Sequence, residues 1–256
     1  MRYIILTKKH IVSFFAFLVV VSIVSVISFV SAANVKRELP IYSVKTDEKK
    51  IAFSFDAAWG NEDTEQLIGI LNKYNIKATF FLVGYWVDKY PESVKALYNA
   101  GHEIGNHSNS HPDMSKLSQD KILEELNACN SKIEKTIGVK PTLFRAPFGA
   151  YNNNLITTVK SIGMNTIQWD CDSKDWMEGH TAERIKNDVL NKVKTGSIVL
   201  SHNAALNTPA ALPAIIEKLQ ADGYTFCKIS DLIYKDNYTI NHKGEQILNK
   251  KATVKP

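Results

Sequence analysis

The sequence predicts an α/β fold in which parallel strands alternate with helices. Apolar runs of strand length recur along the chain, and most are followed by a segment whose apolar residues have helical spacing. Each connection is long enough for a crossover, so successive strands can pair in parallel. With 256 residues, of which 45% are hydrophobic, the chain suffices for one large α/β domain or two small ones. A (β/α) barrel and a doubly wound open sheet both fit this pattern.

Residues 1–33 are predicted to be a signal peptide or a single-pass membrane anchor. Basic residues near the N-terminus precede a nearly uninterrupted apolar run over residues 11–30. That run approaches the ~20 residues that span a bilayer, whereas residues 30–32 resemble a small-x-small cleavage site. Both outcomes stay open. In either case the rest of the chain is expected outside the cytoplasm, secreted or membrane-anchored.

The remaining chain is predicted to contain a linker, one domain and a tail. Residues 34–48 mix charges with Pro40 and show no clear period, which is typical of a linker. Residues 49–235 carry the strand and helix pattern of a single domain. Residues 236–256 are polar and lysine-bearing, and we expect them to form a flexible tail.

Strands and helices follow one another in order within the predicted domain. Strands are predicted over residues 51–55, 78–83, 103–106, 142–144, 164–169, 197–200 and 224–229. Helices are predicted over residues 64–74, 91–100, 118–136, 152–161, 181–193 and 209–221. Cap residues support these limits, since Ser118 begins the longest helix and Gly138 lies beyond its end.

Charge and cysteine content exclude several classes of protein. The formal net charge is +5, but residues beyond position 33 carry 28 basic (31 − 3) and 26 acidic side chains, so no nucleic-acid partner is indicated. Cys129, Cys171 and Cys227 form neither a metal pattern nor a disulfide framework. We expect the three cysteines to be buried and to pack as small apolar residues, with one disulfide and one leftover thiol as the alternative. No glycine-rich phosphate-binding motif follows the first strand, which argues against a nucleotide-binding protein. The protein is expected to be a monomer.

Polar residues able to do chemistry follow five of the predicted strands. They are Asp56, the pair His107 and His111, Arg145, Asp175 and His202. Each alone has a plainer explanation, such as a turn-forming aspartate or a solvated loop histidine. Because the carboxyl ends of parallel strands meet at one edge, these side chains are expected to lie close together. The joint pattern predicts a hydrolase site.

The residue types at these positions suit acid–base hydrolysis beside a metal ion. The four-residue spacing of His107 and His111 lets two imidazoles converge on one ion. His202 is suited to deliver a proton near neutral pH. Arg145 can hold a neighbouring carboxylate ionised through a bidentate contact.

The order of these motifs resembles the polysaccharide deacetylases with a NodB homology domain, carbohydrate esterase family 4. The motifs are Ser54-Phe55-Asp56, His107-Ser108-x-x-His111, Arg145-x-Pro147-x-Gly149, Asp172-x-x-Asp175-Trp176 and Leu200-Ser201-His202. The segments 55–60 and 169–176 look most like the PdaB-type sporulation subgroup. The resemblance implies a distorted or incomplete barrel of seven or eight βα units. It also implies activity on N-acetyl groups of cell-wall glycan, that is, peptidoglycan of the spore cortex.

The resemblance implies a role for each site residue. Asp56 is the base that activates water, and His202 protonates the departing amine. Arg145 orients Asp56, and Asp175 tunes His202. The histidine pair holds a divalent metal ion, with zinc favoured. The residues implied to contact substrate are Trp59, Pro147, Phe148, Trp176 and Leu200.

One position departs from the family pattern. The family's first motif carries two adjacent acids, the second of which is a metal ligand, and Ala57 occupies that place. A tetrahedral catalytic zinc takes three protein ligands, so weak metal binding is expected. The alternative is therefore a non-catalytic glycan-binding or sporulation structural protein on the same fold. A glycoside hydrolase using Asp56 and Asp175 is disfavoured because it gives the histidines no role.

Overall fold

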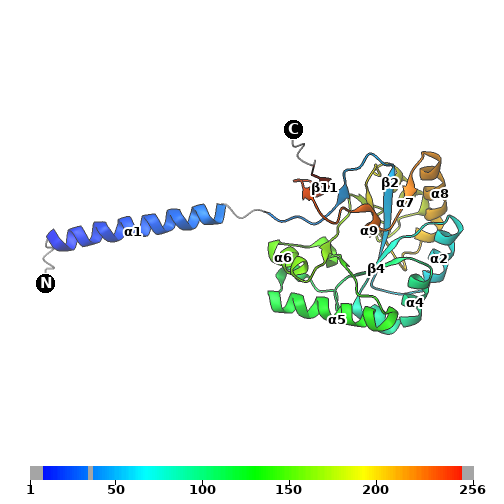
Figure 1. Cartoon of the computed structure of the whole chain (residues 1–256), viewed down its shortest axis with the longest axis horizontal. Coiled ribbons are helices and arrows are strands. Elements are labelled where there is room, and N and C mark those ends of the chain that lie inside the picture. Colours follow the sequence, from blue (N-terminus) through cyan, green and yellow to red (C-terminus); the bar gives the residue numbers. More distant parts are fainter. Residues whose placement is uncertain (1–7, 34–36, 250–256) are drawn as a thin grey trace, which may run out of the picture. The chain divides into compact units, whose positions relative to one another are not determined.

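The computed structural model describes residues 8–33 and 37–249, and the chain divides into two units at Arg37 and Glu38. The first unit contains the 26-residue helix α1 (Lys8–Ala33; Figure 1). Among the described residues, no helix has the length and apolar character needed to cross a bilayer. Parts of the predicted N-terminal segment and linker, residues 1–7 and 34–36, lie outside the described residues.

The second unit is built on a parallel sheet, which confirms the predicted incomplete barrel (Figure 1). The strands pair in the order β6-β5-β4-β3-β2-β8-β7, and β9 pairs with β2. In this order β6 and β7 are the two outer strands, so the barrel is open between them. The strands are β2 (Lys50–Ala57), β3 (Thr79–Leu82), β4 (Glu103–Asn106), β5 (Leu143–Phe144), β6 (Asn165–Thr166), β7 (Cys171–Asp172), β8 (Ile198–His202) and β9 (Thr225–Phe226).

Helices connect the strands, and their ends follow the predicted caps. The Ser118 hydroxyl accepts a hydrogen bond from the Lys121 amide, and Gly138 takes the left-handed conformation at φ 74°. The helices are α2 (Thr64–Lys73), α3 (Gly84–Lys89), α4 (Pro91–Asn99), α5 (Gln119–Ile137), α6 (Asn153–Ser161), α7 (Ala182–Leu190), α8 (Thr208–Ala221) and α9 (Ile229–Leu232), with short 3₁₀ turns at Met114–Lys116 and Pro147–Gly149.

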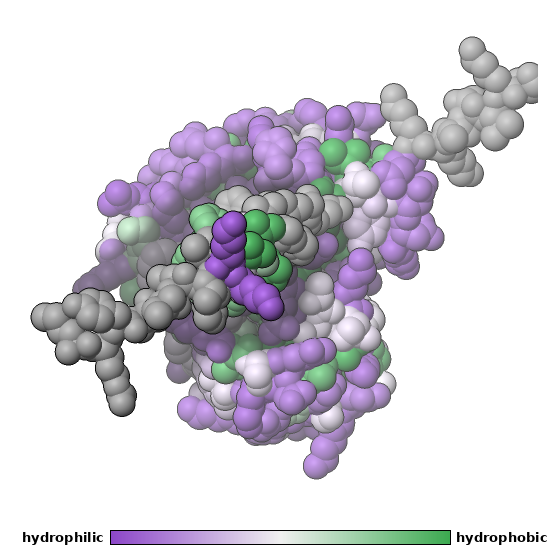
Figure 2. Space-filling model, turned by 90° about the vertical axis from the view of Figure 1, so that its left-hand side faces the viewer, coloured by the Kyte–Doolittle hydropathy of each residue, from purple (hydrophilic) through white to green (hydrophobic). Residues whose placement is uncertain are grey.

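The core lies on both faces of the sheet, and β2 runs through its middle. All residues of β2 after Lys50 are buried, as is typical of a strand covered on both faces. Phe55 stacks on Phe80 of the neighbouring strand, with 4.8 Å between ring centroids. On the face that Figure 2 shows, hydrophilic residues cover most of the surface and hydrophobic residues form separated patches. The three cysteines are unpaired, with Cys129 and Cys171 buried as expected and Cys227 partly exposed.

The strand predicted over residues 164–169 is wrong in extent. Only Asn165 and Thr166 pair in β6, and a separate strand, β7, follows after Asp170. The chain here crosses from one outer edge of the sheet to the other, because Phe144 of β5 pairs with Thr166 whereas Cys171 pairs with Val199 of β8. Periodicity along the sequence cannot reveal such a change of partner.

The predicted linker and tail are wrong over residues 43–44 and 238–248. These residues form a small second sheet of β1 (Ser43–Val44), β10 (Tyr238–Ile240) and β11 (Glu245–Leu248). Gln246 is fully buried and bonds both the amide and the carbonyl of Tyr234, each at 2.8 Å. Polar groups of these residues therefore form hydrogen bonds within the protein rather than with solvent, which composition alone does not show. Residues 250–256 of the predicted tail lie outside the described residues.

Deletion of residues 236–256 is expected to destabilise the folded domain. The deletion removes β10 and β11 and exposes Ile41 and Val44, which are 2% and 1% exposed in the structure. Exposing a buried aliphatic side chain costs about 1.5–3 kcal/mol. Urea unfolding of the truncated and full-length proteins measures the change. Deletion of residues 250–256 alone is the control, and equal stability of all three proteins would contradict the expectation.

Candidate active site

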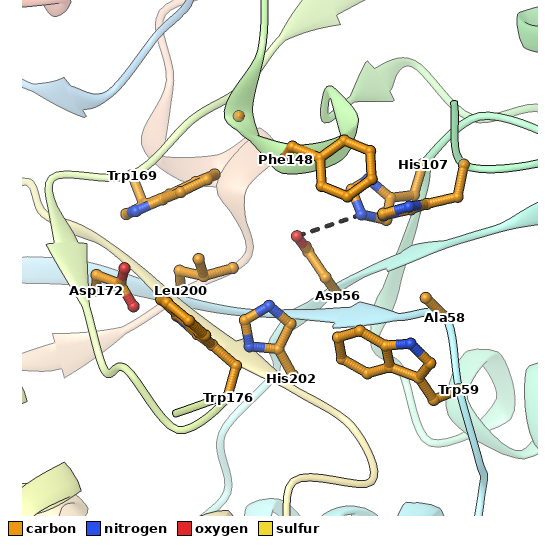
Figure 3. Close-up of a pocket in the computed structure, with 12 residues that line it drawn as sticks. Asp56, Ala58, Trp59, His107, Phe148, Trp169, Asp172, Trp176, Leu200 and His202 are labelled. Atoms are coloured by element: carbon orange, nitrogen blue, oxygen red, sulfur yellow. Dashed lines mark ion pairs between the residues drawn. The ribbon is translucent and has the colours of Figure 1, made fainter. Parts of the chain in front are cut away.

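The predicted site residues meet at the carboxyl edge of the sheet. Asp56 of β2 lies opposite His202 of β8, and β4 ends one residue before His107. Figure 3 shows Asp56 facing a pocket with the side chains of His107 and His202 on either side. The pocket has a volume of about 340 Å³. Its lining residues are Asp56, Ala58, Trp59, His107, His111, Phe148, Gly149, Trp169, Asp172, Trp176, Leu200 and His202.

A buried ion pair fixes the carboxylate of Asp56. The Nη1 atom of Arg145 donates to Asp56 Oδ1 at 2.8 Å, and Nη2 donates to the Ser54 hydroxyl at 2.9 Å. The guanidinium is fully buried, with its carbon 4.2 Å from the ring centroid of Phe81 and 5.4 Å from that of Trp169. Asp56 thus has one oxygen bound to arginine and the other directed to His107, with 3.5 Å between Oδ2 and Nε2.

The surroundings of Asp56 keep it ionised. Burial by itself would raise its pKa, but the charge of Arg145, with smaller contributions from His107 and His202, outweighs burial and lowers the pKa below 3.8. Asp56 is therefore a carboxylate at neutral pH and can accept a proton.

The two histidines of the second motif lie beside Asp56 as neutral imidazoles. The ring centroids of His107 and His111 are 4.9 Å apart. Burial lowers the pKa of His107, and it lowers that of His111 to about 4. His107 Nδ1 is 2.9 Å from the carbonyl oxygen of Arg145, which can only accept, so Nδ1 carries the proton and Nε2 presents a lone pair 3.5 Å from Asp56 Oδ2.

The donor set does not fit a three-ligand metal site. Among residues 8–33 and 37–249, no group of three His, Cys, Asp or Glu side chains is placed to hold a metal ion. Ala57 supplies no ligand because a methyl group has no lone pair, and its side chain is buried in the main apolar cluster, the cluster that contains Phe55 and Phe80. Asp63 does not replace the missing acid, since its Oδ1 accepts from the Ala204 amide at 2.9 Å and the residue does not line the pocket. Two imidazoles suit a metal, but the third ligand is absent from this set.

His202 forms a dyad with Asp175 on the other side of Asp56. Asp175 Oδ1 is 2.7 Å from His202 Nδ1, and Oδ2 accepts from the His202 amide at 2.8 Å. Thr208 donates its hydroxyl to the same Oδ2 at 2.7 Å. Burial lowers the pKa of His202, but the hydrogen bond and charge of Asp175 outweigh it, and the net pKa is raised. His202 therefore retains its proton to higher pH than a free histidine.

The structure separates the predicted site residues into pocket-lining and supporting groups. Arg145 and Asp175 lie behind Asp56 and His202 and do not line the main pocket, and Pro147 is buried in the turn below Phe148. Trp169 and Asp172 also line the pocket and are absent from the site residues that the sequence predicts. Their signal in the sequence was their place in the motif before Asp175.

Comparison with known proteins identifies the family. Residues 43–167 match the polysaccharide deacetylase family. A peptidoglycan-N-acetylglucosamine deacetylase of Bacillus cereus is 36% identical over 197 residues, which cover 75% of this chain and 92% of that protein. The chain belongs to the polysaccharide deacetylase family. The YlxY protein of Bacillus subtilis, described as uncharacterized, is 39% identical to this deacetylase-family chain over 194 residues, and the match spans 76% of the chain but 60% of YlxY.

Solved structures of similar proteins include both active and inactive forms. The deacetylase-family fold of this chain matches wild-type BA3943 of Bacillus anthracis with a TM-score of 0.73 and 34% identity, over 77% of this chain and 69% of that one. BA3943 is described as a pseudoenzyme, and a mutant of it is described as having restored enzymatic activity. The Bc1960 peptidoglycan N-acetylglucosamine deacetylase matches with a TM-score of 0.72 and 29% identity, over 75% and 92% of the two chains.

Proposed function

We propose that this polysaccharide deacetylase removes N-acetyl groups from peptidoglycan by general acid–base catalysis. One observation carries the proposal: an ionised aspartate, Asp56, and a histidine of raised pKa, His202, face the same pocket. Two groups whose surroundings push their pKa values apart are suited to act as base and acid. The relatives named as peptidoglycan deacetylases support this substrate class.

Each step assigned to this chain uses an observed contact. Asp56, held ionised by Arg145, accepts a proton from the water that attacks the acetamide carbonyl. His202 then gives its proton to the amine nitrogen as the carbon–nitrogen bond breaks, and Asp175 stabilises the imidazolium before that transfer. The products are acetate and a free amino sugar.

Exposed aromatic side chains around the pocket support binding of a sugar chain. Trp59 and Trp176 are each 57% exposed and Phe148 is 73% exposed, although large apolar residues are usually buried. Phe148 contacts His111 edge-on, with 4.7 Å between ring centroids. Trp59 and Trp176 also line a second cavity of about 350 Å³, which supports a glycan longer than one sugar. Leu200 also lines the pocket and offers an apolar surface for the methyl group of the acetyl substituent.

Acetate release from peptidoglycan fragments and N-acetylglucosamine oligomers tests the function. We expect turnover by the zinc- or cobalt-supplemented protein, and Asp56→Asn should lower kcat/KM by about 100- to 10,000-fold. Asp231→Asn is the control, because that carboxylate pairs with Lys228 at 3.6 Å and lies outside the pocket. Absence of acetate release by the wild-type protein would overturn the proposal.

A second candidate is a glycan-binding protein without turnover. It is favoured by Ala57, which leaves the described donor set one ligand short, and by the likeness to a pseudoenzyme. This candidate predicts glycan affinity that survives both Asp56→Asn and His202→Ala. Isothermal titration with N-acetylglucosamine oligomers, run beside the acetate assay, separates the two functions.

The cofactor and location belong to the same proposal. We infer that a divalent ion, with zinc favoured, binds weakly at His107 and His111, since each offers a neutral imidazole. The substrate class places the domain outside the cytoplasm. The roles of residues 1–33 as signal peptide or membrane anchor, the action on spore cortex, the PdaB-type subgroup and the monomeric state stay predictions.

Asp175→Asn is expected to move the alkaline limb of the pH–rate profile to lower pH. Activity that needs protonated His202 falls as pH rises through its pKa, and Asp175 raises that pKa. Removing the carboxylate's charge therefore brings the fall in kcat/KM to lower pH. Asp222→Asn, which alters an exposed acid paired with Lys218, serves as the control. An unchanged alkaline limb in Asp175→Asn would argue against His202 as the acid.

A further inference from the structure

A cluster of ionisable side chains, formed by Lys174, His180 and Asp188, lies beside the loop that presents Asp175 and Trp176. The loop, residues 173–180, connects β7 to α7 and contains no helix or strand of its own. Its shape therefore depends on contacts made by side chains. The proposed acid dyad and one wall of the pocket both depend on this loop, because Asp175 bonds His202 and Trp176 lines the pocket.

One carboxylate of α7 bridges the two ends of this loop. Asp188 Oδ1 is 3.2 Å from the ammonium nitrogen of Lys174, and Oδ2 is 3.0 Å from His180 Nε2. The His180 side chain is 6% exposed and that of Asp188 is 25% exposed, so solvent screens these bonds only in part. Lys174 has a φ of 56°, which few residues other than glycine adopt, and its amide is held by Asp172 Oδ1 at 2.8 Å.

The first turn of α8 holds the same loop from the opposite side. The amide nitrogen of the Asn207 side chain donates to the His180 carbonyl at 2.7 Å, and Thr208 donates to Asp175 at 2.7 Å. The loop is thus fastened between α7 and α8, and Asp188 is the α7 residue that bonds both of its ends.

We propose that Asp188 is a positioning residue that sets where Asp175 and Trp176 lie relative to His202. The effect on catalysis rests on the proposed function, but the effect on the loop does not. When Asp188 loses its charge, the ion pair with Lys174 is lost, the bond to His180 weakens, and the loop relaxes. The hydrogen bonds between Asp175 and His202 then weaken, and Trp176 shifts within the pocket.

Fluorine NMR of protein labelled with 5-fluorotryptophan tests the loop directly. The chain has four tryptophans, and Trp176→Phe assigns the signal of Trp176. We expect Asp188→Asn to shift or broaden the Trp176 signal while the signal of buried Trp86 stays in place. Glu183→Gln is the matched control, because it neutralises a carboxylate on the same helix that pairs with Lys186 at 2.7 Å and makes no bond to the loop. A Trp176 signal unchanged in Asp188→Asn would overturn the proposal.

Kinetics separate positioning from general loss of structure. We expect Asp188→Asn to lower kcat by about ten- to a hundredfold, as misplaced catalytic groups do. The alkaline limb of the pH–rate profile should move to lower pH, because Asp175 raises the pKa of His202 less effectively. Asp188→Glu keeps the charge and should restore part of kcat and part of the position of the alkaline limb. Lys174→Gln releases only one end of the loop and should give a smaller change, which guards against a variant that fails to fold. A shifted Trp176 signal with unchanged kcat in an active protein would overturn the positioning role. Absence of turnover in the wild-type protein would refute the proposed function alone, since the NMR result still decides the loop.

Discussion

Ala57→Asp is expected to raise both the bound zinc and the rate of acetate release. The substitution places a carboxylate next to Asp56, at the end of β2, on the edge of the sheet where His107 lies. A third ligand completes the set that a catalytic zinc requires. We expect a gain of more than about 100-fold in zinc affinity, since even groups that only support a ligand are worth about 10- to 100-fold. Elemental analysis after dialysis and the acetate assay measure the two effects.

The burial of Ala57 adds a second readout. Ala57 is 1% exposed and belongs to the main apolar cluster, so an unpaired carboxylate there costs stability. The variant should therefore melt at a lower temperature than wild type without metal, and zinc should raise its Tm more than that of wild type. Ala57→Asn introduces a side chain of nearly the same size as Ala57→Asp but without its charge, and it should gain neither bound zinc nor activity. Equal zinc content in wild type and Ala57→Asp would contradict the view that Ala57 limits metal binding.

Arg145→Met is expected to destabilise the fold by about 3–5 kcal/mol at neutral pH, the cost of breaking a buried ion pair. Arg145 is fully buried and Asp56 is 5% exposed, so the variant leaves a buried carboxylate without its main partner. Burial raises the pKa of Asp56 and Arg145 lowers it, so the folded-state pKa rises in the variant. The stability loss is then smallest at acidic pH, where Asp56 is protonated in both the folded and the unfolded state; it grows as pH rises through the raised folded-state pKa and is constant above it. Urea unfolding at several pH values measures both.

The double variant Asp56→Asn with Arg145→Met separates lost charge pairing from lost packing. It removes both charges, so it should be more stable than Arg145→Met alone at neutral pH. A loss in Arg145→Met that is the same at acidic and neutral pH would refute the ion-pair explanation.

The positions of the site residues could be predicted because parallel strands bring their carboxyl ends together. Asp56 and His202 follow apolar runs and His107 follows the short strand 103–106, and these local signals predict that the three residues lie at one edge of the sheet. The second sheet could not be predicted in this way. Its strands lie at opposite ends of the domain, and Ser43 meets Glu245 only through tertiary pairing. Local composition at either end indicates a polar linker or tail.

The α/β class, the helix caps and the residue types at the strand ends could be predicted from the sequence, because they depend on local spacing and on the period of apolar residues. It also showed that Ala57 stands where the family has an acid. The family resemblance already implied the pairing of Arg145 with Asp56 and of Asp175 with His202, and the structure adds their contact distances and the bonds of Asp188 to both ends of the neighbouring loop. Those relations join residues far apart in the chain, and their energies come from burial and contact distances that exist only once the sheet has formed.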